Sequence, residues 1–307
     1  MDQLIVHHFD ASPFAEKVRL ILGFKGLDWV SVKIPMIMPK PDVVALSGGY
    51  RKTPILQVGA DVYCDTALIA RVLDARAPEP TLFPAGAPLA PLLAQWADWT
   101  LFWTVVDFAS QPAAFEHRFR DMPPDVVKAI VADRTPFRAP VPSQTAADAA
   151  ANLGAMLAAL DTQLADDRRF LFCDASIADF SVAHCLWHLR RAGPVADVVV
   201  GPHRALVAWH DRMLALGHGT SMTIESSAAI EIAAGANGHA PTEVEPGLGF
   251  NLGDPVSVSA TDYGTDPVTG TLVGLTPREV VVEPRDERAG NVHVHFPRSG
   301  FQIKANT

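Results

Sequence analysis

The spacing of hydrophobic residues near the start of the chain predicts a strand, a helix and a second strand. Residues 4–9 form a continuous apolar run with β-branched members, which is typical of a buried strand. Ser12-Pro13 then begins a segment whose apolar residues recur at helical spacing, with serine at the N-cap and proline at the first helical position. Residues 29–34 form the second apolar run. The three segments predict a parallel βαβ unit with a right-handed connection.

Residues 50–66 predict a short hairpin that leads into a helix. Thr53-Pro54 opens an apolar strand over residues 55–58, a Gly-Ala-Asp turn follows, and a second strand covers residues 62–64. Asp65-Thr66 then stands at the head of an apolar-periodic helix that runs to residue 75. With a short helix near residues 42–46, the order predicts a four-stranded mixed sheet with helices on both faces. We expect this α/β domain to occupy residues 1–78.

A second pattern, helical throughout, follows a proline-rich linker at residues 78–91. The predicted helices cover residues 92–109, 124–133, 145–165, 177–191 and 203–216. Aromatic residues line the first of these helices, and they are interpreted either as core packing or as the wall of a substrate pocket. We expect an all-helical bundle domain over residues 88–234.

The last part of the chain changes period again. A linker rich in glycine and proline begins near residue 235. Short runs with a period of two follow at residues 255–260, 270–273, 279–283, 291–296 and 301–303, separated by turn residues. Five short strands in so few residues predict a small all-β domain, an SH3-like barrel, over residues 245–307.

Composition narrows the class of protein. The 307 residues are 49% hydrophobic and 19% charged, which fits several folded domains. The net charge of −9 argues against nucleic acid as a partner, because phosphate binding needs a basic surface. Three cysteines without metal or disulfide spacing fit a reducing compartment. The first residues do not resemble a signal peptide, and no apolar run is long enough for a membrane span. We therefore expect a cytoplasmic protein without a membrane partner.

Two candidate binding features each have a structural alternative. Ser12 lies in the positive field of a helix start, where a hydroxyl and backbone N–H groups stabilise a thiolate, but Ser-Pro is also an ordinary helix cap. Thr53-Pro54 suits a cis peptide bond that presents the backbone of Thr53 to a peptide-like ligand. A proline at a sheet edge is the alternative.

The helix start at Asp65-Thr66 suits an α-amino acid. The hydroxyl and the free N–H groups of the helix would take the carboxylate, and Asp65 would take the ammonium; a plain capping pair is the alternative. Arg51 and Lys52 would meet a second carboxylate, or they are solvated loop charges.

Other polar motifs have structural interpretations. Ser176-x-x-Asp179 has the form of a capping box at a helix start, with aspartate in place of glutamate. Two histidine pairs, at residues 7–8 and at residues 293 and 295, lack a third and fourth ligand at a fitting spacing, so no metal is expected. Cys64 is interpreted as a small buried hydrophobic residue.

Taken together, Ser12-Pro13-Phe14, Thr53-Pro54 and Asp65-Thr66 follow the order and spacing of a glutathione S-transferase N-terminal domain, which is thioredoxin-like. The helical part with Ser176 and Asp179 resembles the C-terminal domain of that superfamily. The resemblance covers residues 1–234, and the tail from about residue 245 lies outside the usual two-domain plan.

The resemblance implies glutathione as co-substrate. It places Ser12 as the catalytic hydroxyl that faces the glutathione sulfur, with Phe14 and Lys52 in the same binding site. Thr53 would pair with the cysteinyl backbone beside a cis Pro54. Asp65, in place of the commoner glutamate or glutamine, and Thr66 would hold the γ-glutamyl end. The second substrate would be a small hydrophobic electrophile, and the protein would be a homodimer.

Two other functions remain open. A non-catalytic binding protein would keep the fold and work through its C-terminal β domain. A thiol reductase would need a cysteine at position 12, where this chain has Ser12.

Overall fold

The first domain is built on a mixed sheet covered by helices. The computed structural model describes residues 3–166 and 168–306. The elements of this domain are β1 (Ile5–His8), α1 (Pro13–Lys25), β2 (Asp28–Lys33), α2 (Pro41–Ser47), β3 (Ile55–Val58), β4 (Asp61–Cys64) and α3 (Thr66–Arg76). β1 pairs with β2 in parallel and with β3 antiparallel, and β3 pairs with β4. The predicted βαβ unit and hairpin are therefore confirmed.

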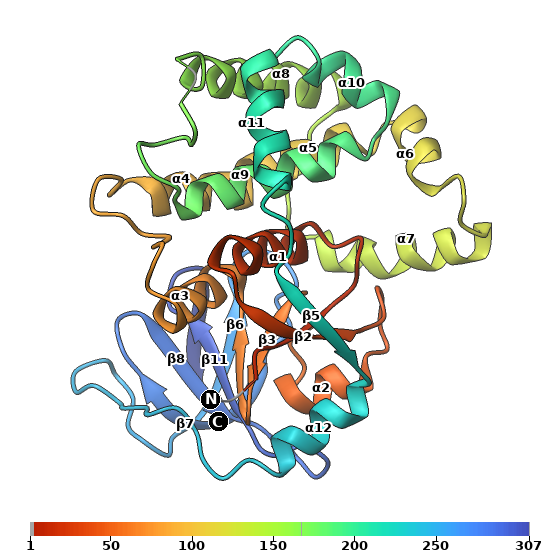
Figure 1. Ribbon diagram of the computed structural model, residues 1–307. Helices are drawn as coiled ribbons and strands as arrows, with labels where there is room; N and C mark the ends of the chain where they lie inside the picture. The colour runs from red at the N-terminus through yellow and green to blue at the C-terminus, as the bar shows by residue number, and fades with distance from the viewer. Residues whose placement is uncertain (1–2, 167, 307) are drawn as a thin grey trace.

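A segment beyond the helical domain returns to this sheet. β5 (Thr220–Ile224) adds a parallel edge strand next to β2, and α12 (Ser226–Ala234) packs against α2 (Figure 1). From the sequence we expect these residues in the helical domain, whereas the structure places them against the first sheet. Most of the side chains of β5 are exposed, so the strand lacks the apolar pattern that would have revealed it.

The helical domain lies over the α1 side of the sheet (Figure 1). Its elements are α4 (Ala90–Trp96), η1 (Ala97–Leu101), α5 (Phe102–Phe108), α6 (Pro112–Phe119), α7 (Pro124–Arg138), α8 (Ala146–Gln163), α9 (Ile177–Arg190), α10 (Pro194–Val200) and α11 (Arg204–Leu214). α4, η1 and α5 follow one another without a break and form the long aromatic helix that the sequence predicts; η1 is a π-helical turn inside it. α6 was not predicted, because only Ala114 of its side chains is buried.

α9 is the central helix of this domain. Ser176 and Asp179 form a capping box at its start, and the Asp179 carboxylate also accepts a hydrogen bond from the backbone N–H of Leu171, at 2.8 Å. Most of the side chains of α9 are buried, including His184 and His188. Among the described residues, no helix is long and apolar enough to cross a membrane.

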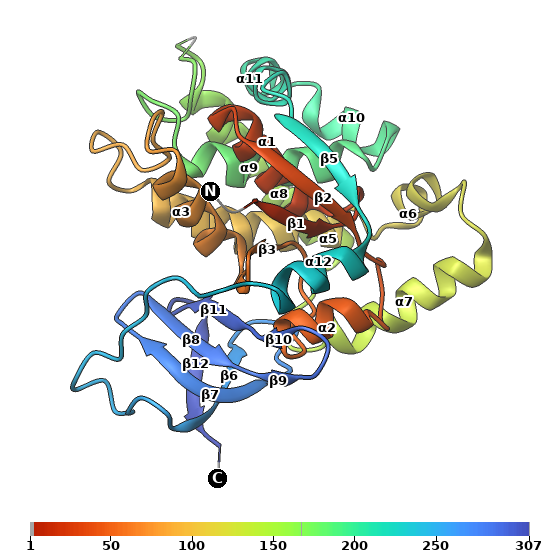
Figure 2. The same cartoon turned by 60° about the horizontal axis from the view of Figure 1, so that its bottom comes forward.

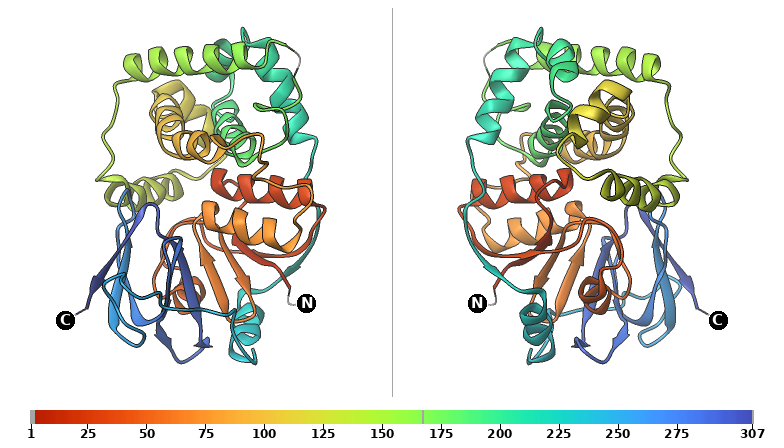
Figure 3. Two further views of the ribbon diagram at one scale, coloured as in Figure 1. Left: turned by 90° about the vertical axis from the view of Figure 1, so that its left-hand side faces the viewer. Right: turned by 90° about the vertical axis from the view of Figure 1, so that its right-hand side faces the viewer.

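Most of the C-terminal strands extend the first sheet. They are β6 (Pro255–Ala260), β7 (Val268–Leu275), β8 (Glu279–Glu283), β9 (Arg285–Asp286), β10 (Gly290–Asn291), β11 (His293–Pro297) and β12 (Phe301–Ala305). β11 pairs in parallel with β4, which joins ten of the described strands into one sheet in the order β12-β6-β7-β8-β11-β4-β3-β1-β2-β5 (Figures 2 and 3). β9 and β10 pair with each other in a separate two-stranded sheet. The added β unit is confirmed. Its described pairing is an open row joined to β4 and gives no support for a closed SH3-like barrel.

Candidate functional site

The start of α1 and the loop before β3 meet at Ser12 and Thr53. The Ser12 Oγ accepts a hydrogen bond from the backbone N–H of Ala15 at 3.2 Å, so Ser12 is the N-cap of α1. The same hydroxyl donates to the backbone oxygen of Thr53 at 3.5 Å, the long limit of a hydrogen bond. The Thr53–Pro54 peptide bond is cis. The structure thus brings together two residues that are far apart in the sequence.

Asp65 has an unusual backbone and an unpaired carboxylate. Its φ of 75° lies in a region that side chains other than asparagine and aspartate rarely adopt. Its Oδ1 accepts a hydrogen bond from the backbone N–H of Ala67, at 2.8 Å, as the N-cap of α3. None of the ion pairs formed by the described residues involves Asp65, and burial raises the pKa of its carboxyl. The site therefore holds a partly desolvated negative charge that lacks a cation.

A buried network of hydrogen bonds and ion pairs contacts the Thr66 side chain. The Lys17 ammonium, which is fully buried, donates to Thr66 Oγ1 at 3.1 Å and to Asp98 Oδ2 at 2.6 Å. His184 Nε2 lies 2.9 Å from the other oxygen of Asp98. Burial opposes the charge on Asp98, but Lys17 and His184 outweigh it and lower the pKa of Asp98 to about 2. Asp98 belongs to η1, and π-helical turns occur often at functional sites.

Lys40 is a second buried cation beside the site. Its ammonium donates to the Thr53 hydroxyl at 3.1 Å, and its side chain is only 3% exposed. Burial, with repulsion from Arg134 and Arg51, lowers the pKa of Lys40 to about 8. In the part of the chain that the structure describes, no carboxylate forms an ion pair with Lys40.

Arg51 and Lys52 have acidic partners within the chain. Arg51 forms an ion pair with Asp133 of α7 at 2.6 Å. Lys52 forms one with Asp262 at 2.6 Å, and its ammonium also lies 4.0 Å from the centre of the Tyr263 ring. Their charges are therefore largely compensated. Of the three cations near Thr53, Lys40 is the one left for a ligand carboxylate.

The loop between β6 and β7 reaches this site from the C-terminal strands. The ring of Tyr263 stacks with Trp99 and meets the rings of Trp103 and Phe137 edge-on, at centroid distances of 6.4, 5.0 and 5.1 Å. Gly264 then passes so close to α7 that a Cβ would lie 2.3 Å from the Phe137 ring. The loop is thereby fixed as one wall of the site.

A cavity of about 290 Å³ opens between Ser12 and the helical domain. Phe14 lies at its edge, with its ring 4.7 Å from that of Phe102. Phe102 and Trp103 are buried, which confirms core packing for these two residues, and they also line the cavity. Its other large apolar lining residues are Phe9, Met36, Val106, Phe115, Phe119, Met122, Ile130, Val131, Phe137 and Tyr263.

Arginine side chains also line this cavity, beside its apolar residues. Four of them contribute: Arg118, Arg134, Arg138 and Arg191. Arg138 is paired with Asp107, and Arg134 lies near Asp133. Neither Arg118 nor Arg191 has a carboxylate partner among residues 3–166 and 168–306. Burial and the positive charges of Arg191 and Arg134 lower the pKa of Arg118 to about 10.

Sequence reasoning missed the residues that join the site from several elements. Lys17 had a signal, because it follows Phe14 by three residues and so shares a helix face with it. Lys40, Asp98, Arg118 and Tyr263 had no local signal, since distant segments bring them to the site.

Comparison with known proteins identifies the family. A sequence model of the glutathione S-transferase N-terminal domain matches residues 6–81, and one of the glutathione S-transferase C-terminal domain matches residues 143–212. A solved structure described as a GST-like protein from Pseudomonas syringae is 40% identical, with a TM-score of 0.83, and the match covers 100% of both chains. The chain therefore belongs to the glutathione S-transferase superfamily.

More distant structures share the fold. A glutathione S-transferase from Rhodospirillum rubrum is 22% identical, with a TM-score of 0.52, over 69% of this chain and 88% of that one. A glutathione transferase from Pseudomonas putida, solved with one glutathione disulfide bound per subunit, is 16% identical, with a TM-score of 0.50, over 69% and 87% of the two chains. A search of curated proteins found no match.

Proposed function

We propose that this protein binds glutathione and activates its thiol for attack on a small electrophile. The observation that carries this proposal is the unpaired, partly buried carboxylate of Asp65 beside the hydroxyl of Thr66. A desolvated charge without a partner is costly, and an ammonium group from a ligand would relieve that cost.

The γ-glutamyl end of glutathione is an α-amino acid that suits this arrangement. Its ammonium would pair with Asp65, and its carboxylate would accept hydrogen bonds from the Thr66 hydroxyl and the first N–H groups of α3. Lys17 already donates to Thr66 Oγ1 at 3.1 Å, which leaves the hydroxyl proton free to point at the ligand. Lys17 is thus a positioning residue in this proposal.

The other end of glutathione would reach Lys40. Thr53 would pair its backbone with the cysteinyl unit in the manner of an added strand. The glycine carboxylate would then meet the Lys40 ammonium, which lies beside the Thr53 side chain and lacks an acidic partner in the described structure. Lys40 thereby takes the part that the sequence analysis gives to Arg51 and Lys52.

Activation of the thiol would fall to Ser12 and the start of α1. A hydroxyl donor and the positive end of a helix both favour a thiolate, and together they lower a thiol pKa by roughly a unit or more. The Ser12 hydroxyl donates at 3.5 Å to Thr53, a bond weak enough to be exchanged for one to sulfur. Positioning of the thiolate beside the cavity would supply the rest of the rate enhancement.

The lining of the cavity favours an acceptor that is aromatic and carries a negative charge. Aromatic side chains supply flat apolar walls, whereas Arg118 and Arg191 bring positive charge that has no carboxylate within the described residues. Neighbouring guanidinium groups repel one another, and an anionic group on the acceptor would relieve that repulsion. A purely hydrophobic electrophile would not reduce the repulsion between these guanidinium groups.

Matched acceptors test this preference. Chloronitrobenzoate and its methyl ester react by the same substitution, in which the carbon–sulfur bond forms, the carbon–chlorine bond breaks and chloride leaves. After division by the uncatalysed rates, we expect kcat/KM to favour the carboxylate by about 10-fold. Arg118→Met should abolish the preference. Arg120→Met removes an exposed arginine paired with Asp121 and should preserve it. An equal preference in all three proteins would rule out an anion-selective pocket.

Glutathione binding itself is tested by calorimetry and thermal shift with the full chain. Glutathione at 100 times its Kd should stabilise the protein by about 2.7 kcal/mol, and cysteinylglycine, which lacks the γ-glutamyl unit, should give no shift. Turnover of chlorodinitrobenzene then separates a transferase from a non-catalytic binding protein. Binding without turnover would favour the second function, in which the C-terminal strands carry the activity.

Assembly and compartment complete the proposal. We expect a homodimer, as the superfamily resemblance implies, and light scattering after gel filtration measures it. Cys64, Cys173 and Cys185 are all unpaired thiols, which supports a reducing compartment such as the cytoplasm.

A further inference from the structure

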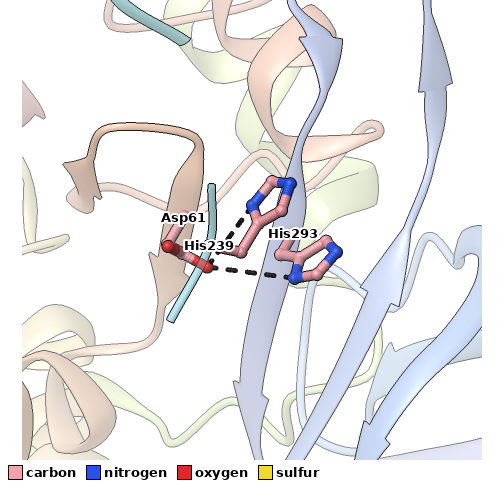
Figure 4. Close-up of side chains that lie close together, drawn as sticks. All are labelled: Asp61, His239 and His293. Atoms are coloured by element: carbon pink, nitrogen blue, oxygen red, sulfur yellow. Dashed lines mark ion pairs between the residues drawn. The ribbon is translucent and has the colours of Figure 1, made fainter. Parts of the chain in front are cut away.

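Two histidines and an aspartate meet at the end of β4 that is remote from Asp65. Asp61 begins β4, and His293 begins the neighbouring strand β11, in register with Asp61. His239 comes from the linker between α12 and β6. Figure 4 shows the two rings beside the Asp61 carboxylate. Three separate segments of the chain thus contribute one potential metal ligand each.

The distances suit a small cation. Asp61 Oδ1 lies 3.8 Å from His239 Nδ1 and 4.0 Å from His293 Nδ1. The two rings stack with centroids 3.6 Å apart and an interplanar angle of 11°. Ligand atoms around a tetrahedral Zn²⁺ are about 3.4 Å from one another, given bond lengths near 2.1 Å. Because an imidazole lone pair lies in the plane of its ring, at least one of the two rings would rotate about its Cβ–Cγ bond, out of the stacked arrangement, to point both Nδ1 atoms at one ion.

One ring nitrogen of each histidine is unsatisfied among the described residues. The Nδ1 atoms of His239 and His293 are buried, and both are without a partner in the described structure. Buried polar atoms are nearly always hydrogen bonded, so two such nitrogens facing one carboxylate oxygen call for an explanation. A metal ion between them would satisfy both lone pairs at once.

Neighbouring groups hold the ligands in place. His295 Nε2 donates to Asp61 Oδ1 at 2.8 Å, while its Nδ1 donates to Glu279 at 2.7 Å. The Glu283 carboxylate lies 3.8 Å from His293 Nε2, on the side of the ring away from Asp61. A carboxylate there favours the tautomer that leaves Nδ1 free for a metal.

From these observations we propose that Asp61, His239 and His293 bind a divalent first-row transition metal, with Zn²⁺ as the expected ion. Asp61 and His239 also line an open cavity of about 900 Å³, which gives the ion an entry path and a water as fourth ligand. Because the ligands come from β4, β11 and the linker, the ion would fasten the C-terminal strands to the first domain. The spacing of residues in the sequence does not reveal this site, because Asp61 and His239 are far along the chain from His293.

The test is calorimetric titration of the full chain with ZnCl₂, supported by the absorption spectrum with Co²⁺. We expect one Zn²⁺ per chain with a Kd in the micromolar range or tighter, a tetrahedral Co²⁺ spectrum, and a higher Tm with Zn²⁺. His239→Gln should weaken binding at least 10-fold and remove the Tm rise. His239 Nδ1 has no hydrogen bond to lose, so this variant should fold normally.

Two controls make the result specific to this cluster. His203→Gln removes a histidine at the start of α11 whose side chain makes no capping hydrogen bond, and Cys173→Ser removes the exposed thiol. Both should bind Zn²⁺ like the unmodified protein. Equal binding by the unmodified protein and His239→Gln, or no stoichiometric binding at millimolar Zn²⁺, would overturn the proposal. This site is separate from the glutathione site, so its outcome is independent of the proposed function.

Discussion

The two ends of strand β4 carry aspartates in opposite electrostatic situations. Asp61, at the start, accepts hydrogen bonds from His295 and from the Ala240 backbone, and its pKa is lowered. Asp65, just after the end, accepts a hydrogen bond from the Ala67 backbone N–H as its one partner among the described residues, and burial raises its pKa. The first carboxylate is satisfied within the chain and the second is not.

The two ends of β4 therefore differ in which group lacks a partner, and this difference indicates two kinds of ligand. At the Asp65 end the unsatisfied group is a negative charge, which calls for an ammonium. At the Asp61 end the carboxylate accepts hydrogen bonds, and the unsatisfied atoms among the described residues are two imidazole nitrogens, which call for a metal ion. Both ends contain an aspartate, so the ligand of each site is indicated by the group that lacks a partner and not by the residue type.

The largest effect we expect comes from Ser12, which links the Asp65 end to chemistry. Ser12→Ala should slow glutathione conjugation by about 100-fold, as for the loss of one donor to a developing negative charge. It should also cost about 1 kcal/mol of stability through the lost cap. Steady-state turnover and thermal unfolding measure the two effects.

Thr145→Ala is the matched control for the loss of a cap. Thr145 caps α8 by accepting a hydrogen bond from the Asp148 N–H, and it is not one of the residues that line the cavity. This variant should lose similar stability but keep its turnover. If both variants turn over at the rate of the unmodified protein, Ser12 is only a cap.

A second experiment contrasts the two ends of β4 directly. Asp65→Asn keeps the capping acceptor and tolerates the positive φ, but it removes the charge. Binding of S-methylglutathione should weaken by roughly 10- to 100-fold, which is the worth of a hydrogen bond to a charged group. Asp61→Asn should leave that affinity unchanged. Calorimetry measures both, and an equal loss in the two variants would contradict the contrast.

Lys40 predicts a pH dependence of glutathione binding. Its charged form binds a carboxylate, and because its pKa in the folded protein is about 8, affinity should fall as the pH rises through 8. From pH 7 to about pH 9 we expect a loss of roughly 10-fold. S-methylglutathione is the probe, because it has no thiol to titrate.

Lys40→Met isolates this titration. The variant should bind weakly at pH 7 and lose the extra pH dependence, while the titration of the ligand itself remains in both proteins. The folded-state pKa lies below the unfolded value, so the charged lysine opposes folding fully below pH 8 and less as the pH rises. Without ligand, Lys40→Met should therefore raise Tm at pH 7 by a few degrees. A pH profile parallel to that of the unmodified protein would exclude Lys40 from the site.

Local patterns predicted much of the fold. Strand and helix periods, with Pro13 and Pro54 at their starts, located the first domain and the main helices within a few residues. The β unit followed from its alternating pattern as well. β5 was missed because an exposed edge strand has no apolar period, and the joining of β11 to β4 is a backbone pairing that no side-chain pattern encodes.

The candidate site divides in the same way. Ser12, Thr53 and Asp65 are visible in the sequence because each begins an element at a cap or a proline. Lys40 and Tyr263 are not, because their meaning depends on which distant groups surround them. Lys40 becomes a candidate binding residue only once the structure shows that it is buried and that no carboxylate of the described residues pairs with it.

The most direct test of the glutathione site is a crystal structure of the full chain soaked with glutathione. We predict density with the γ-glutamyl ammonium about 2.8 Å from the Asp65 carboxylate, the cysteinyl backbone against Thr53, and the sulfur facing Ser12. Density elsewhere in the molecule, or no density at a glutathione concentration that shifts Tm, would contradict it.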